Sequence, residues 1–565
     1  NHHKHNLNVG FDARRVQNNV IGSTNVLGSF TFSGIYTQDP NASTSTRGST
    51  TTNSGSSFAD FLLGAPQQSA IQSGLNKIHL RETVVNAYGF DDWRALPNLS
   101  LNLGLRYEYF SPYYETNNQL VNLDHSADFT TVAPVLPDGT GPFGGKFPRS
   151  LVNPDRTMFS PRLGLAWRPK GNNRFARNTV VRAGYGINYN TTAFGSFANS
   201  LSYQVPFAVT QTNIASLPGS NDAGCGTFTA PGTVNHSTFT LTNAFNCTSK
   251  AVTNNFAINR NYRLGRVQVM NAGIQHTFGL GILVNVDYNG SLGANLDILR
   301  APGATPTGLA TTNGQAYTFE DSAANSRFSS VFVSARKRMS RGIALQATYT
   351  YGHGIDNAST LSGGGGTVAQ NYQRLDLEYG NSNFDVRHRA TGTWVFELPF
   401  GENRAFLNKG GWLSYALNGF NLSGDFTFAT GTYATPQYQN TAAQLVTGGN
   451  YTLRPDRVFS EPIQGAGSLR SWFNTAAFTA PPSGAFGNSS RNSIELPGTV
   501  SEDMSLSRDF TFGDLKNLEV RATANNVFNT VQYSGVNTVL NSANFGQVST
   551  VAPARRLSFQ ARYRF

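Results

Sequence analysis

The chain has 565 residues and a formal net charge of +11, yet only 13% of its residues are charged, about half the usual share in soluble domains. Hydrophobic residues make up 39% and aromatic residues 12%, so the shortage of charge is not offset by a large aliphatic core. No apolar run approaches the ~18 residues of a transmembrane helix. Nucleic acid is not an expected partner, because the basic residues are scattered and their one cluster, residues 336–341, lies at a predicted turn.

Apolar and polar residues alternate along many stretches, which is the period of a β-strand. In "NLSLNLGLRYEYF" (residues 98–110), leucines and tyrosines form one face and polar residues the other. The pattern predicts about 15 strands, most of ~9–13 residues, the length that a tilted strand needs to cross a bilayer. The predicted strands lie near residues 7–15, 28–38, 80–93, 98–110, 161–168, 179–190, 267–278, 281–290, 328–338, 342–352, 387–400, 419–430, 501–512, 517–528 and 555–565.

From residue 80 onward, the connections between predicted strands alternate between shorter and longer. The shorter set includes residues 94–98, 169–178, 278–281, 338–342 and 513–517, with 401–418 as an unusually long member. The longer set comprises residues 111–160, 191–266, 291–327, 353–386, 431–500 and 529–554. Short periplasmic turns and long extracellular loops are typical of bacterial outer-membrane barrels.

This alternation gives each strand a direction. If the last strand runs down to the periplasm, the strand near residues 7–15 also runs down, which agrees with an odd count. Single-chain bacterial barrels have even counts. The first residue is Asn1 rather than Met, so we expect the chain to be the later part of a longer protein, with an odd number of strands upstream.

The apolar face of each strand is expected to touch lipid and the polar face an aqueous lumen. Burial of Leu101, Tyr185, Leu345 and Phe559 against a second layer would contradict this interpretation. Aromatic residues gather at both predicted interfaces, as the belts of a membrane barrel do. The residues expected to line the lumen include Arg106, Glu108, Arg182, Asp287 and Arg521.

Candidate chemical motifs are few. Cys225 and Cys247 lie in one long predicted loop, which in an exported protein favours a disulfide over two free thiols. A loop leading into a strand explains His2, His3 and His5 better than a metal site does. The remaining candidates, His353, His388, Asp356 and Asp385, lie near the ends of strands and show no catalytic motif. We therefore expect no enzyme activity, no metal and no cofactor.

Several stretches resemble TonB-dependent outer-membrane receptors, especially the Oar-like branch that has a carboxypeptidase-regulatory-like front domain. They include "AYGFDDWRALPNLSLNLGLRYEYFSPYYETNNQL", "NFDVRHRATGTWVFELPFG" and "WFNTAAFTAPPSGAFGNSSRNSIELPG". The resemblance implies a 22-stranded barrel around an N-terminal plug, with uptake driven by the TonB complex. It also implies that the terminal "ARYRF", with Tyr563 and Phe565, is a membrane-assembly signal for the barrel-assembly machinery.

The sequence thus predicts that residues 1–565 form one partial all-β domain: an antiparallel transmembrane β-barrel in the outer membrane of a Gram-negative cell. About 15 of an expected 22 strands are present, and seven strands, the plug and the TonB box are expected upstream. By itself, the chain is therefore expected to leave a gap or to form a smaller, strained barrel, with exposed edges near residues 7–15 and 555–565.

The predicted function is TonB-energised uptake of an oligosaccharide, peptide or metal chelate, recognised by loops 111–160, 191–266 and 431–500. Contact with outer-membrane lipid and lipopolysaccharide is expected from the net positive charge. Two alternatives stay open: a surface or adhesion barrel without energised transport, and a porin-like channel.

Overall fold

The computed structural model describes most of the chain. The exceptions are residues 1–3, 23–24, 33–35, 38–55, 67, 76, 172, 215–239, 246–250, 254, 303, 306–307, 310–316, 360–367, 402–403, 439–452 and 513–515.

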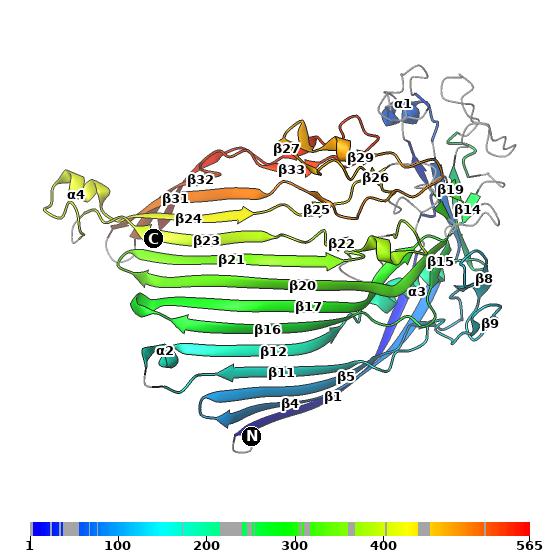
Figure 1. Cartoon of the computed structure of the whole chain (residues 1–565), viewed down its shortest axis with the longest axis horizontal. Helices are drawn as coiled ribbons and strands as arrows, with labels where there is room; N and C mark the ends of the chain where they lie inside the picture. Colours follow the sequence, from blue (N-terminus) through cyan, green and yellow to red (C-terminus); the bar gives the residue numbers. More distant parts are fainter. Residues whose placement is uncertain are drawn as a thin grey trace.

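One antiparallel sheet dominates the structure (Figure 1). Seventeen described strands belong to it. Three are short additions at the ends of longer strands: β6 (Tyr114–Glu115), β15 (Asn255–Ile258) and β22 (Gly380–Asn381). The other fourteen pair in chain order: β1 (His5–Ile21), β4 (Lys77–Leu96), β5 (Leu99–Phe110), β11 (Phe159–Trp167), β12 (Thr179–Tyr189), β16 (Arg266–Thr277), β17 (Ile282–Arg300), β20 (Tyr317–Ser340), β21 (Ile343–Asp356), β23 (His388–Glu397), β24 (Phe420–Ala429), β31 (Thr499–Phe512), β32 (Lys516–Asn525) and β35 (Arg556–Arg564).

The register places the apolar residues of neighbouring strands on one common face. Leu345 of β21 lies opposite Trp394 of β23, and Ala522 of β32 lies opposite Phe559 of β35. This face is not covered by a second layer: Leu345 is 39% exposed and Phe559 83% exposed. Leu101 and Tyr185 are also not buried. The predicted lipid-facing surface is therefore present, and the all-β fold class is confirmed.

The inward face is polar but also carries large aromatic side chains beside glycines. Tyr88 of β4 covers Gly10 of β1, so a Cβ atom at residue 10 would lie 2.3 Å from the tyrosine ring. Phe90 covers Gly104 of β5 in the same way, with a Cβ at 2.2 Å. The glycines are needed because inward-facing rings occupy the space beside them.

The two ends of the sheet differ as the sequence predicted. The short connections carry α2 (Arg174–Arg177), η1 (Gly279–Gly281) and α4 (Trp412–Leu417), and both chain termini lie at this end (Figure 1). The opposite end carries α1 (Ser57–Leu62), α3 (Ala193–Ser202), η2 (Leu375–Glu378) and η3 (Thr475–Ala477). No helix within the described ranges is long and apolar enough to cross a membrane.

Small sheets fill the long loops. A four-stranded sheet joins β2 (Ser29–Thr31), β3 (Gln68–Gly74), β13 (Ala208–Ile214) and β14 (Ala251–Thr253). The remaining pairs are β7 (Asn122–His125) with β8 (Val132–Val135), β9 (Thr140–Gly141) with β10 (Gly145–Lys146), β18 (Ala304–Thr305) with β19 (Gly308–Leu309), β25 (Tyr433–Ala434) with β30 (Ile494–Glu495), β26 (Asp456–Arg457) with β29 (Phe478–Thr479), β27 (Gln464–Ser468) with β28 (Ser471–Phe473), and β33 (Tyr533–Val536) with β34 (Val548–Val551).

The predicted spanning strand at residues 28–38 is wrong. Among the described residues of this range, only β2 forms a strand, and it belongs to the four-stranded loop sheet, where Phe30 packs on Phe245 with ring centroids 4.9 Å apart. The predicted total of 15 spanning strands is therefore one more than the fourteen long strands of the described sheet.

The predicted downward direction of the first strand is also wrong. His5 of β1 lies opposite Trp93, near the short turn after β4, and Ile21 lies opposite Lys77 at the long-loop end. β1 therefore runs up towards the loops. The parity argument for an odd number of strands upstream, and with it the figure of seven, loses its basis.

The predicted loop at residues 291–327 is much shorter in the structure. β17 continues to Arg300 and β20 begins at Tyr317, so both strands extend past the lipid-facing band. Both faces of these extensions carry buried residues: Ile298 and Leu299, whose side chains point to opposite faces, are 0% and 7% exposed. Burial under the loops explains why these residues lack the alternation that marks the lipid-facing strands.

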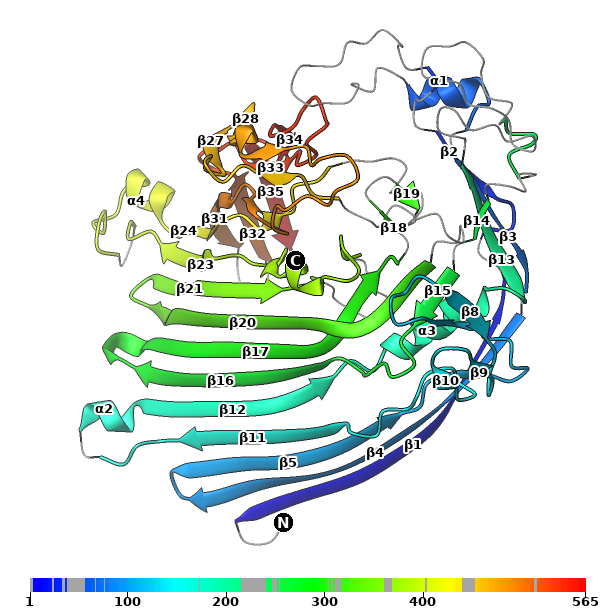
Figure 2. The same ribbon diagram turned by 45° about the vertical axis from the view of Figure 1, so that its right-hand side comes forward.

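The two outer strands of the sheet are unpaired on one side, as predicted. Among the described residues, β1 pairs only with β4, and β35 pairs only with β32. Every residue of β35 is exposed. Figure 2 shows the sheet curving round from β1 towards β32 and β35 without joining them. The barrel is open in this chain.

The lipid-facing assignment predicts effects of very different size for neighbouring residues of β20. Val333 faces outward between Val286 and Tyr349, whereas Ser334 faces the lumen. We expect Val333→Arg to lower the free energy of unfolding by about 2–4 kcal/mol in lipid vesicles, because the charge enters hydrocarbon.

The matched control is Ser334→Arg, which places the same charge in the aqueous lumen and should cost less than ~1 kcal/mol. Denaturant titration of the barrel in vesicles measures both values. Equal costs for the two variants would contradict the assignment of the faces.

Candidate functional site

The largest buried apolar cluster lies at the long-loop end. It joins the upper part of β4, the segment after β5, α3 and the segment around β15. Its fully buried members are Ile78, Leu80, Leu120, Val135, Phe147, Leu151, Val152, Met158, Ala193, Phe194, Phe197, Ala198, Leu201, Ile258, Tyr262 and Leu264. Two of the predicted recognition loops, 111–160 and 191–266, are therefore packed against each other and against the inward face of the sheet.

Two buried amide side chains connect these loops. The Asn122 side chain donates to the carbonyl oxygens of Ile258 (2.9 Å) and Leu151 (3.3 Å), and its Oδ1 accepts from the Ile258 backbone N–H (3.0 Å). Gln204 donates to the Val121 carbonyl at 2.7 Å and accepts from the Phe256 N–H at 2.7 Å. Each amide side chain forms hydrogen bonds with backbone groups of two segments. These bonds fix the position of one segment relative to the other.

One buried carboxyl group lies beside this cluster. Asp297, near the upper end of β17, accepts a hydrogen bond from the Tyr262 hydroxyl. Burial raises the pKa of the Asp297 carboxyl to about 6, because the charged form is poorly solvated there. The Asp297 carboxyl group therefore gains its proton as the pH falls through about 6, and its contact with Tyr262 links the loop to the sheet.

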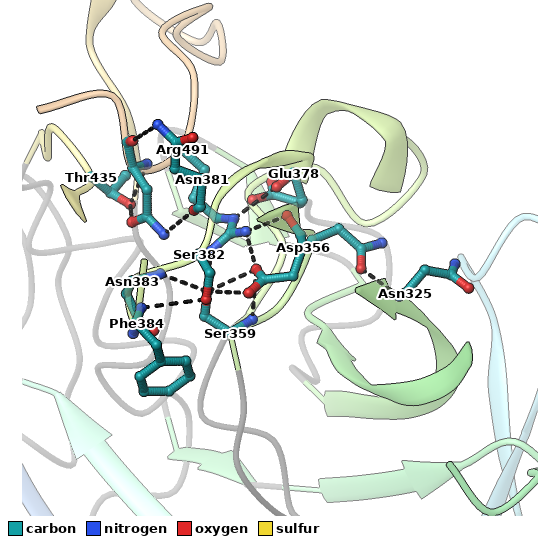
Figure 3. A network of polar contacts seen from close by, with 12 residues as sticks. Asn325, Asp356, Ser359, Glu378, Asn381, Ser382, Asn383, Phe384, Thr435 and Arg491 are labelled. Atoms are coloured by element: carbon teal, nitrogen blue, oxygen red, sulfur yellow. Dashed lines mark hydrogen bonds and ion pairs between the residues drawn. The ribbon is translucent and has the colours of Figure 1, made fainter. Parts of the chain in front are cut away.

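A second packed region joins the loop after β21 to the loop before β31 (Figure 3). Arg491 is buried there and donates to the carboxylate and the backbone carbonyl of Asp356, the last residue of β21. It also donates to Ser359 Oγ at 2.8 Å and to the Glu378 carbonyl at 2.7 Å. One side chain thus bonds three points of the neighbouring loop.

A second buried ion pair reinforces the same contact. Arg454 Nη1 lies 2.7 Å from Glu378 Oε2, and the two side chains are 4% and 2% exposed. Gln370 donates to the Gly487 carbonyl at 2.8 Å, and its Oε1 accepts from the Arg454 N–H at 2.6 Å. We call Asp356, Glu378, Arg454 and Arg491, with Gln370, the loop clamp.

A cavity of about 260 Å³ opens beside the loop clamp. Its lining combines the rings of Phe328 and Phe384 with polar groups of Asn325, Ser382 and Asp385. Phe328 lies on the inward face of β20, so the cavity is on the lumen side of the sheet.

The four titratable residues noted in the sequence do not form a catalytic group. Asp385 accepts from the Gly354 N–H at 2.9 Å and pairs with Arg387 at 3.1 Å, and Asp356 binds Arg491. His353 contacts Asn381 at 3.2 Å, and His388 contacts the Tyr349 hydroxyl at 2.8 Å. The two acids line the inner cavity, whereas the register puts both histidines on the opposite face.

The predicted lumen residues lie on the inward face. Arg106 Nε and Glu108 Oε1 are 3.0 Å apart, and Arg521 pairs with Glu519 at 2.5 Å. Asp287 lies against Gly273, where a Cβ atom would be 1.9 Å from its Oδ1. Arg182 is exposed on β12. These side chains give the inner wall fixed charges of both signs.

The remaining predicted sites have different outcomes. Cys225 and Cys247 lie outside the described residues, so their disulfide stays a prediction, and His2 and His3 also lie outside. Within the described ranges, no group of three or more His, Cys, Asp or Glu residues could hold a metal ion. Tyr563 and Phe565 stack with ring centroids 5.9 Å apart at the exposed edge of the sheet, and they stay a predicted assembly signal.

Sequence reasoning missed the loop clamp. Arg491 and Asp356 are 135 residues apart, and neither stands in a motif. Only the folded sheet brings the loop after β21 beside the loop before β31. The loop segments that carry them gave no signal that distinguishes these residues from solvated ones.

We predict that the Arg491→Ala variant loosens the loops that the loop clamp joins. Removing the guanidinium leaves the buried Asp356 carboxylate without its main partner, which typically costs about 3–5 kcal/mol. We expect faster amide hydrogen exchange across the described parts of residues 368–387 and 453–496, measured by mass spectrometry in detergent or nanodiscs.

Arg374→Ala is the matched control, because Arg374 and Asp376 form an ion pair in the same loop whose side chains are 58% and 63% exposed. This variant should change exchange very little. Equal exchange in the two variants would show that the loop clamp does not hold the loops together.

The profile of one family, described as outer membrane beta barrel domain, matches residues 1–558. No curated protein matches the chain.

Solved structures that resemble the chain include the outer membrane transporter YddB from Escherichia coli, at 12% identity and a TM-score of 0.43, covering 88% of this chain and 50% of that one. The siderophore receptor PiuA from Acinetobacter baumannii has 11% identity and a TM-score of 0.39, covering 88% and 44%. The ferric yersiniabactin uptake receptor FyuA from Yersinia pestis has 9% identity and a TM-score of 0.38, covering 88% and 47%.

The chain thus spans about half the length of the solved structures it matches. The family match covers nearly the whole chain, and it agrees with the exposed apolar face, the polar inner face and the alternation of short turns with long loops. The chain belongs to the outer membrane beta barrel domain family and is a protein of the outer membrane.

Proposed function

We propose that this chain is the barrel of a receptor that takes a bulky substrate through the outer membrane. The observation that carries the proposal is the pair of packed loop regions at the extracellular end, one built on an apolar cluster and one on the loop clamp. These loops are already ordered in the folded protein. A ligand that binds to them therefore loses less of its binding free energy to the conformational entropy of the loops.

The proposed substrate is an oligosaccharide or a peptide, with a metal chelate as the third class. Recognition by loops 111–160, 191–266 and 431–500 is supported by their length and by the packing of their described parts. The cavity beside the loop clamp supports the first two classes, because the rings of Phe328 and Phe384 line it together with the Asn325 amide and several serine and aspartate side chains. Sugars and peptides both combine apolar faces with hydrogen-bonding groups.

Energised transport rests on the resemblance to TonB-dependent receptors. In that case the TonB complex acts through an N-terminal segment outside this chain, and a plug fills the lumen. The inward ion pairs of Arg106 with Glu108 and of Arg521 with Glu519 offer polar contacts for such a plug.

Liposome swelling separates this proposal from its rivals. We expect vesicles that contain the full-length protein to stay impermeable to arabinose, because a plugged receptor excludes small sugars. Cells that express the protein should take up a fluorescent oligosaccharide or oligopeptide probe only when TonB is present. Free arabinose leakage would indicate a porin-like channel, and probe binding without TonB-dependent uptake would indicate a surface protein.

We further infer that lipopolysaccharide is a lipid partner. Above the lipid-facing residues of β1 and β4, the outward face carries a basic ridge formed by Arg15, Arg81 and Arg149 around Tyr114. Arg15 and Arg149 lie over the Tyr114 ring, with guanidinium carbons 5.4 Å and 4.4 Å from its centroid. Arg15 also donates to Thr83 Oγ1 at 2.6 Å. The hydrogen bonds of the ridge go to neutral groups, so its charge is available to lipid phosphates.

The double variant Arg15→Gln/Arg81→Gln tests the basic ridge. We expect at least about tenfold weaker binding of lipopolysaccharide to the purified protein, because two charge-assisted phosphate contacts are lost. Arg14→Gln is the control, since Arg14 is the neighbouring residue on the inward face and pairs with Asp12 at 2.9 Å. Unchanged binding by the double variant, or equal loss with dephosphorylated lipopolysaccharide, would contradict the assignment.

A further inference from the structure

The short helix α4 lies in the longest connection at the periplasmic end, between β23 and β24. It projects beyond the ends of these strands in both ribbon views (Figures 1 and 2). The other described connections at this end are shorter. The transport function does not account for an extra helix here.

Arg508 fixes α4 to the sheet. In the register of β31, Arg508 lies opposite Phe420 and Val520, on the same face as Leu506 and Phe510. This is the lipid-facing side of the sheet, where an uncovered arginine is costly. Yet Arg508 is only 9% exposed.

The cover over Arg508 comes from α4 and three aromatic rings. Its guanidinium donates to the carbonyl oxygens of Ala416 at 2.6 Å and Tyr415 at 2.9 Å. These carbonyls belong to the last turn of α4, where no intrahelical donor is available. The guanidinium carbon also lies 4.3 Å, 5.4 Å and 5.5 Å from the ring centroids of Phe510, Phe420 and Tyr415. The C-terminal end of α4 is therefore attached to the outward face of the sheet.

The rest of α4 is exposed and apolar. Trp412 is 77% exposed and Tyr415 74% exposed, and their spacing of three residues puts them on one side of the helix. Leu413 and the preceding Phe406 and Leu407 are exposed as well. Such a group of large apolar side chains is unfavourable in water.

We propose that α4 lies in the inner-leaflet interface of the outer membrane, with Trp412 and Tyr415 at the level of the lipid headgroups. Arg508, with the rings of Phe420 and Phe510 on the lipid-facing side of the sheet, joins α4 to that surface, so lipid is the proposed occupant. Tryptophan and tyrosine are the residues that favour this depth, because their rings are apolar and their N–H and O–H groups reach water. The helix anchors one side of the barrel rim, independently of what the barrel transports.

Quenching of Trp412 by brominated phospholipids tests the proposal. The chain has five tryptophans, so the contribution of Trp412 is the difference between the full-length protein and its Trp412→Phe variant in vesicles. We expect this component to be quenched by about half or more when the bromines lie near the headgroups, and less when they lie near the bilayer centre.

Trp472→Phe is the matched control, because Trp472 lies in an extracellular loop and donates to the Glu495 carbonyl at 2.8 Å. Its component should not respond to lipid bromines. A Trp412 component that responds only to aqueous iodide would place α4 in the periplasm and overturn the proposal. Trp412 could also be protected from iodide in a way that depends on protein concentration, without quenching by lipid bromines. This result would indicate that a second copy of the chain covers α4, and it would also overturn the proposal.

A second variant tests the attachment by Arg508. Arg508→Met keeps an unbranched apolar side chain but removes all donors to α4. We expect amide exchange of residues 412–418 to speed up at least tenfold, with β31 and β32 unchanged, and the quenching of Trp412 to lose its preference for headgroup bromines. Unchanged exchange and unchanged quenching would show that Arg508 does not hold α4 at the membrane.

Discussion

The structure depends on one constraint: a backbone that crosses lipid must find all its hydrogen-bond partners within the protein. Each long strand from β4 to β32 meets this requirement with a neighbour on both sides, and the alternation of side chains then separates a face for lipid from a face for water. β1 and β35 lack a neighbour on one side among the described residues. The curved sheet in Figure 2 is thus the wall of a barrel that is not closed. The barrel can close only if the free edges of β1 and β35 each form hydrogen bonds with another strand.

Polar interactions follow the same division between lipid and water. On the lipid-facing side of the wall, the charge of Arg508 is covered by helix carbonyls and aromatic rings. Above the lipid, the loops bury charge in pairs, as in Arg454 with Glu378. A buried pair contributes little net stability, but breaking it is costly. The loop clamp therefore holds one loop arrangement against others more than it raises the total stability of the fold.

Much of the wall could be predicted from the sequence, because a period of two is a local property. The strands around "NLSLNLGLRYEYF" and "RRLSFQARYRF" were predicted within a few residues of β5 and β35. The error at residues 28–38 has a clear cause: the same alternation also suits a small sheet in a loop, and β2 uses it there. That single error reversed the predicted direction of β1.

By itself, the sequence determined the all-β class, the outward and inward faces, the two kinds of connection and the membrane environment, since each follows from the order of neighbouring side chains. Only the tertiary structure decided that Arg491 meets Asp356, that Asn122 joins two loops, and that Arg508 caps α4. These contacts join residues 92 to 136 positions apart, and nothing in the local pattern of either partner identifies the other. Their partners are set by which strands lie side by side, because the loops can meet only after the wall has formed.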